Sequence, residues 1–182
     1  MADIHFLKGR VLTKLSRFAE AEDAYSQVIS IDNKYQGAWF NIGTNNLRQN
    51  KVPQAIYNYF NEMNEHPSAQ TMVQIGKAYS DLGKADSAHL SYEKAIQINS
   101  GFAPAYMRLS HLKKDAGEIN EAINHAKKGI ELEPEKIDYK YFMGSLLLLN
   151  GQPNLSIPYF ELVVNEKPWH YWAHHNLSLI HI

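Results

Sequence analysis

Cysteine is absent from the 182-residue sequence, and long apolar runs are missing as well. The first absence excludes disulfides, thiol catalysis and cysteine-based zinc sites. The longest apolar run is Leu146–Leu149, far shorter than a membrane span. An excess of positive or negative charge is also missing, since the formal net charge is −1. Neither nucleic acid nor a membrane is therefore expected as a partner. No secretory signal is recognised at the N-terminus, which favours the cytoplasm.

Small residues recur along the chain at nearly constant spacing. Glycine or serine returns at steps of 33 or 34 residues, at positions 9, 43, 76, 110, 144 and 178. Twelve residues after each of the first five stands alanine or serine, and four residues further comes an aromatic residue in four cases. Such self-similarity is the signature of a repeat architecture. It divides the chain into repeats 2–35, 36–68, 69–102, 103–136 and 137–170, with a partial sixth at 171–182.

Each repeat is predicted to form two antiparallel helices joined by a central turn. In three repeats the second helix is expected to end near Pro67, Pro134 or Pro168, because proline cannot continue a helix interior. The recurring small residues leave room for the two helices to approach closely. The aromatic residue is expected to fill the space between neighbouring pairs. The chain is therefore predicted to be a single all-α array over 1–182.

The motif WFNIG at 39–43, followed by Ala55, Tyr59 and Pro67, resembles the tetratricopeptide repeat family, as does IGKAYSDLG at 75–83. The resemblance covers essentially the whole chain. It implies a right-handed α-solenoid of stacked antiparallel helix pairs. It also implies a non-catalytic scaffold that binds a protein or peptide in the concave groove lined by the first helices.

Four polar residues depart from the pattern of that family. Asn46 and Lys113 stand where an aromatic residue is usual, and Glu62 stands where alanine is usual. Lys8 replaces an apolar residue in the first repeat. Because an end repeat lacks one neighbour, Lys8 is interpreted as part of a polar end face.

Some positions of the first helix in each repeat are expected to point towards the groove, as judged from helical periodicity. The fifth position of the five full repeats is apolar or aromatic. The ninth position, together with the sixth position of the second to fourth repeats, supplies hydrogen-bond donors. An extended or helical acidic peptide fits such a lining, since its carboxylates meet donors and its apolar side chains meet the apolar positions. The residues predicted to line the groove are Phe6, Arg10, Phe40, Asn41, Thr44, Gln74, Lys77, Met107, Arg108, His111, Tyr141 and Ser145.

Two narrower functions of the family do not carry over. The clamp for chaperone tails requires lysine, asparagine and arginine at set positions, of which only Asn41 is present in the first three repeats. The asparagine ladder at the sixth position is interrupted by Leu7, Gln74, Arg108 and Phe142. Two alternatives stay open: the chain is the substrate-recruiting part of a larger enzyme of glycosyltransferase or sulfotransferase type, or it associates with itself.

No catalytic constellation or cofactor motif stands out, so the chain is not expected to be an enzyme. His170 and His174 have the i, i+4 spacing of metal ligands on a helix, but no carboxylate nearby completes the set. Packing and surface roles are the better interpretation of these histidines. Trp169, Tyr171 and Trp172 are interpreted as packing between repeats, with an exposed aromatic anchor for a partner as the alternative.

The last six residues, LSLIHI at 177–182, end the chain inside a predicted helix. They are also the in-frame translation of CTGTCTCTTATACACATC, a transposase end sequence used in preparing sequencing libraries. Residues 177–182 are therefore predicted to derive partly or wholly from such an adaptor, which would make the chain a fragment.

Overall fold

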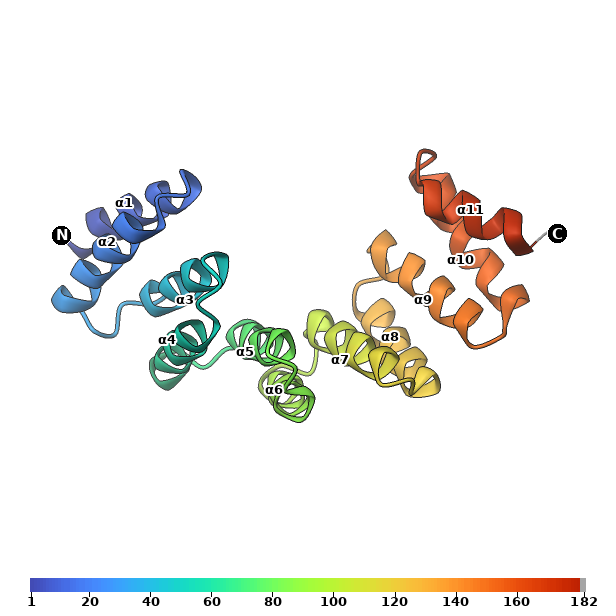
Figure 1. The fold of residues 1–182 in the computed structure, drawn as a ribbon, viewed down its shortest axis with the longest axis horizontal. Helices are drawn as coiled ribbons and strands as arrows, with labels where there is room; N and C mark the ends of the chain where they lie inside the picture. The colour runs from blue at the N-terminus through green and yellow to red at the C-terminus, as the bar shows by residue number, and fades with distance from the viewer. Residues whose placement is uncertain (181–182) are drawn as a thin grey trace. The chain divides into compact units, whose positions relative to one another are not determined.

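The computed structural model describes residues 1–180, which form eleven helices and no strand (Figure 1). The predicted all-α fold of helix pairs is confirmed, since helices that follow each other within a repeat pack against one another. Of the stretch 177–182, residues 181 and 182 lie outside the described part, and 177–180 continue the last helix. The helices are α1 (Ala2–Lys14), α2 (Phe18–Ile31), α3 (Ala38–Arg48), α4 (Val52–Glu65), α5 (Ala69–Asp81), α6 (Ala85–Ile98), α7 (Ala103–Asp115), α8 (Ile119–Leu132), α9 (Ile137–Leu149), α10 (Pro153–Glu166) and α11 (Tyr171–Ile180).

The chain divides into two compact units. The first unit is Met1–Asn99 and contains α1 to α6, and the second begins at Ser100 and contains α7 to α11. Successive pairs within the first unit are joined by packing of α2 on α3 and of α4 on α5. In the second unit α8 packs on α9 and α10 packs on α11. Within each unit, therefore, the second helix of one pair supports the first helix of the next.

Close approach of the two helices in a pair depends on a glycine that faces an aromatic ring. A Cβ atom at Gly76 would lie 2.5 Å from Cε1 of Tyr92, and one at Gly9 would lie 2.6 Å from Cε1 of Tyr25. Tyr59 and Phe160 cover Gly43 and Gly144 in the same way. Contacts this short leave no room for a side chain, which explains the recurring small residue. The predicted close approach is thus confirmed.

The central turns share one backbone feature. Gly83, Gly117 and Gly151 each have a positive φ of 70–79°, which glycine adopts without steric cost. The equivalent turns of the first two repeats contain Ser16 and Asn50, with φ of 58° and 60°. A residue with a Cβ atom is strained in this conformation, and serine more so than asparagine.

Asn46, one of the departures from the apolar pattern, belongs to a polar network in the first unit. Its side-chain nitrogen donates to Glu22 Oε1 at 2.6 Å, and its side-chain oxygen accepts from Asn58 Nδ2 at 2.7 Å. The network links α2, α3 and α4. Because Asn46 and Asn58 are both buried, these hydrogen bonds replace those that water would otherwise make.

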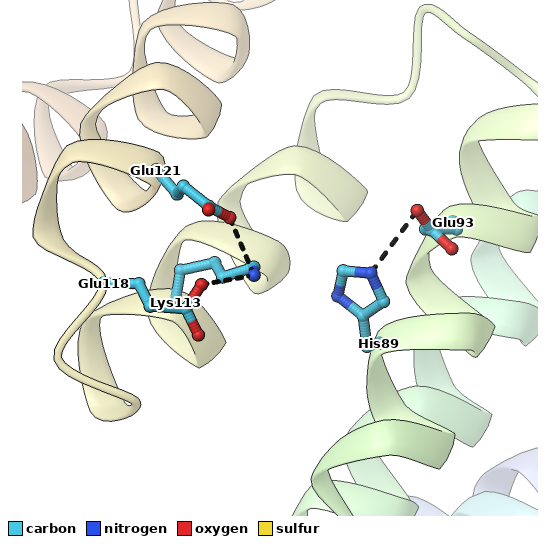
Figure 2. Close-up of polar contacts among 5 residues, drawn as sticks. All are labelled: His89, Glu93, Lys113, Glu118 and Glu121. Atoms are coloured by element: carbon cyan, nitrogen blue, oxygen red, sulfur yellow. Dashed lines mark hydrogen bonds and ion pairs between the residues drawn. The ribbon is translucent and has the colours of Figure 1, made fainter.

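Lys113, a second departure, forms a charged cluster in the second unit. Its Nζ lies 2.6 Å from Glu118 Oε2 and 2.7 Å from Glu121 Oε2, so it stands between the two carboxylates as Figure 2 shows. Hydrogen bonds to these carboxylates raise the pKa of Lys113 to about 12, and Lys113 holds the pKa of Glu121 below its usual range. The contact links the end of α7 to the start of α8, where an aromatic residue would otherwise pack.

The polar end face expected at the N-terminus is not what the structure shows. Lys8 is exposed, as predicted, but apolar side chains surround it on the outward face of α1. The expectation failed because it rested on a single residue, whereas the exposed face includes neighbours one helical turn away. These apolar residues are Ile4, Leu7, Val11 and Leu15.

Candidate functional site

In the first unit, the predicted groove residues lie on α1, α3 and α5, the first helices of their pairs. Phe6 is half-buried: its ring centroid lies 5.7 Å from that of Tyr25 and 5.0 Å from that of Tyr35. Phe40 is also half-buried, and its ring lies 5.4 Å from that of Tyr59. Both phenylalanines therefore anchor the helix pairs while leaving part of each ring accessible.

Asn41 and Thr44 are engaged within α3 and its partner helix. Asn41 Nδ2 donates to the carbonyl oxygen of Gly37 at 2.6 Å. Thr44 Oγ1 donates to the carbonyl oxygen of Phe40 at 3.0 Å and lies 3.2 Å from the hydroxyl of Tyr59. Burial raises the pKa of Tyr59, which remains a neutral phenol at physiological pH. The Thr44 hydroxyl and the side-chain nitrogen of Asn41 thus already have partners, whereas no hydrogen bond from within residues 1–180 engages Asn41 Oδ1.

Arg10, Gln74 and Lys77 are differently placed. Arg10 is exposed, and Gln74 and Lys77 are half-buried on α5. None of the three has a hydrogen-bond or ion-pair partner within residues 1–180. The first-helix side of this unit therefore presents two unpaired cations and one free amide.

In the second unit, Met107 differs from the other predicted groove residues. Its side chain is only 5% exposed and belongs to the core that joins α7, α8 and α9. A Cβ atom at Gly129 would lie 2.6 Å from the Met107 sulfur, so the thioether fills the space above that glycine. The repeat position of Met107 did not predict its burial. Burial depends on the facing residue of α8, which is glycine and leaves room for the methionine side chain.

His111 stacks on Phe142, which the sequence did not single out as a groove residue. The two ring centroids lie 3.9 Å apart, and Lys114 Nζ lies 5.9 Å from the Phe142 centroid. Loss of hydration on the covered side lowers the pKa of His111, and the nearby charges of Lys114 and Arg108 act in the same direction. His111 is therefore a neutral hydrogen-bonding group near pH 7, while the neighbouring Arg108 is exposed and charged.

Tyr141 is half-buried between two rings on the first-helix side of α9. Its centroid lies 5.8 Å from that of Phe160 and 4.6 Å from that of His170. Ser145 is one turn further along the helix, and its hydroxyl donates to the carbonyl oxygen of Tyr141 at 3.0 Å. Ser145 thus resembles Thr44 of the first unit, since its hydroxyl is used within its own helix.

The packing interpretation of the aromatic cluster before α11 is wrong. Trp169 is 81% exposed, and Tyr171 and Trp172 are also largely exposed. Tyr171 and Trp172 contact each other edge to face and both lie near His175. Sequence position alone could not predict the exposure of these three side chains, because it depends on which side of α11 packs on α10.

The histidines of this region bind backbone groups. His170 Nδ1 accepts a hydrogen bond from the N–H of Ala173 at 3.1 Å, at the start of α11. His174 Nε2 lies 2.9 Å from the carbonyl oxygen of Pro168. Within residues 1–180 no group of three histidine or acidic side chains is arranged to hold a metal ion. None of the described helices has the length and apolar character needed to cross a bilayer.

Comparison of the sequence with known families matches it to a model described as a tetratricopeptide repeat. It matches at residues 2–35, 69–102 and 103–136. These are the limits expected for the first, third and fourth repeats. A curated protein of Mycosarcoma maydis, the small glutamine-rich tetratricopeptide repeat-containing protein 2, is 37% identical over 57 residues. That match spans 31% of this chain and 16% of the fungal protein.

Solved structures of the same fold extend over nearly the whole chain. The crystal structure of MamA is similar with a TM-score of 0.74 and 21% identity, and covers 92% of both chains. YrrB, which is described as a tetratricopeptide repeat protein with an unusual peptide-binding site, gives a TM-score of 0.71 at 14% identity. That alignment covers 98% of this chain and 92% of YrrB. At these identities the likeness establishes the fold.

Proposed function

Because this chain belongs to the tetratricopeptide repeat family, whose members generally act in protein–protein interactions, we propose that it is a non-catalytic scaffold that binds acidic peptide segments. The binding surface is the first-helix side of its helix pairs. The observation that carries the proposal is a pair of cations without hydrogen-bond or ion-pair partners among the described residues, Arg10 on α1 and Lys77 on α5, in the unit that also holds the half-buried rings of Phe6 and Phe40.

Each part of that surface has a distinct chemical use. Arg10 and Lys77 supply charged donors for carboxylates, and the Arg10 guanidinium can bind one in a bidentate manner. Gln74 offers both a donor and an acceptor to a peptide backbone. The accessible edges of Phe6 and Phe40 cover apolar side chains of the peptide. Thr44 contributes mainly by holding α3 in shape, since its hydroxyl is already hydrogen-bonded, whereas Asn41 Oδ1 can accept a hydrogen bond from the peptide backbone.

The second unit presents a separate surface of the same kind. Arg108 supplies the charge, neutral His111 supplies a hydrogen bond, and Tyr141 supplies a partly exposed ring. Met107 acts there only through the core. YrrB has the same fold and is described as having a peptide-binding site, which supports peptide binding as the use of the fold.

The proposal is tested with an array of synthetic peptides of equal length whose net charge runs from acidic to basic. Acidic peptides should bind best, and Arg10→Glu together with Lys77→Glu should weaken their binding roughly tenfold or more, because both charges are reversed. The matched control is Lys94→Glu, the same charge change at an exposed site on α6. Circular dichroism reports whether the variants keep their helices. Unchanged affinity of the double variant for acidic peptides would overturn the proposed site.

A further inference from the structure

An apolar stripe runs along the outward side of α1. Ile4, Leu7, Val11 and Leu15 are 69%, 56%, 56% and 60% exposed. We call these four residues the α1 stripe. At 100° per residue they fall within one narrow strip of the helix surface. Gly9, which is buried against Tyr25 of α2, lies on the opposite side. Four neighbouring exposed aliphatic side chains form a continuous patch, whereas single exposed ones need no explanation.

Other first helices bury the same side. Ile4 stands at the third position of its repeat, where Ala38, Thr71 and Ala173 are buried in α3, α5 and α11. Each of these helices packs on the second helix of the pair before it. Val11 stands at the tenth position of its repeat, where Asn45 of α3 and Ala78 of α5 are likewise buried. The fold therefore uses this side of a first helix to receive another helix, and within residues 1–180 no helix covers it on α1.

Basic residues border the stripe on both sides. Lys8 lies along one edge, and Arg10 and Lys14 lie along the other. None of them forms a close ion pair within the described residues, although the charge of Lys8 acts on the Glu20 carboxylate and helps to lower its pKa. A hollow of about 210 Å³ lies between Leu7 and Val11 on one side and Arg10 and Lys14 on the other. The nearby carboxylate of Asp3 accepts a hydrogen bond from the Tyr35 hydroxyl at 2.7 Å and is already engaged.

We propose that the α1 stripe is a docking site for an acidic amphipathic helix of a partner protein. The apolar face of that helix covers the four aliphatic side chains, and acidic residues on both of its edges meet Lys8, Arg10 and Lys14. A helix is the fitting occupant because this side of a first helix receives a helix elsewhere in the chain. The positive edges select an acidic partner over a basic one. The site shares Arg10 with the peptide surface proposed above, but its apolar contact surface is the α1 stripe, and its test does not use Arg10.

The test uses two synthetic amphipathic peptides with the same leucine face, one edged with glutamate and the other with lysine. Binding to the full chain is measured by fluorescence anisotropy. We expect the glutamate peptide to bind roughly tenfold or more tightly than the lysine peptide. Lys8→Glu with Lys14→Glu should reverse that order. Leu7→Gln with Val11→Gln should weaken the glutamate peptide by a similar factor, because the apolar contact is lost without a change in charge.

Two controls separate this site from others. Leu90→Gln makes the same change at a side chain that is 65% exposed on α6 and should bind the glutamate peptide like the unmodified chain. Lys77→Glu, which alters the proposed peptide surface, should leave it unchanged as well. Equal binding of the two peptides, or binding that survives Leu7→Gln with Val11→Gln, would refute the proposal. Sedimentation could instead show that the chain is a dimer that dissociates when Leu7 and Val11 are changed to glutamine. The α1 stripe would then bind a second copy of this chain, and the proposal would also be overturned.

Discussion

Glu62 accepts a hydrogen bond from the backbone N–H of Gly37, with 2.8 Å between Oε1 and the nitrogen. Its second oxygen, Oε2, accepts from the N–H of Phe40 at 3.2 Å. Gly37 is the N-cap of α3 and has no side chain with which to bind these groups. A carboxylate from α4 thus caps the first helix of its own pair, where it also meets the positive end of the helix dipole.

Replacement of Glu62 by alanine should destabilise the chain, although alanine is the usual residue at this position of the family. Glu62 is 4% exposed, so its loss leaves two N–H groups without their acceptor. We expect the free energy of unfolding to fall by about 1–2 kcal/mol. Urea titration followed by circular dichroism measures the change, and Glu62→Gln should lose less because one acceptor oxygen remains.

Glu65→Gln serves as the control for this change, since Glu65 lies on the same helix but is exposed and pairs only with Lys34 on the surface. Its effect should be small. An alanine variant at position 62 as stable as the unmodified chain would show that the cap contributes nothing.

Gly76→Ala should destabilise the first unit through a steric conflict with Tyr92. The new Cβ atom would lie 2.5 Å from the ring, so the two helices must move apart at an expected cost of about 1–3 kcal/mol. The cost should largely vanish when the glycine is replaced in a Tyr92→Ala background, and a thermodynamic cycle from urea titrations gives the coupling. The fourth repeat shows a related solution, with Ser110 opposite Ala122 and Ala126 in place of the aromatic residue. Equal costs in the two backgrounds would contradict this interpretation.

Ser16→Gly should raise the stability of the chain. Ser16 has a φ of 58°, a conformation that costs a residue with a Cβ atom more than it costs glycine. Glycine also loses more chain entropy on folding, so the net gain should be about 0.5–1 kcal/mol. Gly117→Ala tests the reverse change, because nothing lies within 4 Å of the added Cβ atom and only the backbone term remains. Thermal unfolding should move up for the first variant and down for the second.

His111 should titrate below the ordinary histidine pKa of about 6.5. Contact with Phe142 removes water from the ring and so lowers the pKa of His111 in the folded chain. Between that lowered pKa and 6.5 the unfolded chain binds more protons, so stability should decrease as the pH falls through this window. A proton NMR titration of the His111 ring measures the midpoint, and Phe142→Ala should move it upwards. A midpoint at or above 6.5 would rule out the desolvation.

The helix pairs and their limits could be predicted from the sequence because they depend on local spacing. The close approach of α3 and α4 at Gly43, for example, follows from periodicity, whereas Tyr59, expected to fill the space between pairs, packs on Gly43 within its own pair. The all-α fold and membership of the repeat family follow from the same pattern.

The polar departures could not be interpreted in this way. Asn46 is satisfied by Glu22 and Asn58, which lie 24 and 12 residues away on two other helices. Glu62 reaches the start of a helix 25 residues earlier in the chain. Their roles depend on which side chains the packed helices bring together. Exposure of Trp169 and burial of Met107 escaped prediction for the same reason, since each is decided by a neighbouring helix.

The glycine–aromatic contacts also bear on how the chain folds. Each joins residues only 16 positions apart, so the loop that must close before the contact forms is short. Folding rates rise as the sequence distance between contacting residues falls. The contacts within a helix pair should therefore form early, and packing on the neighbouring pair of the same unit then stabilises them.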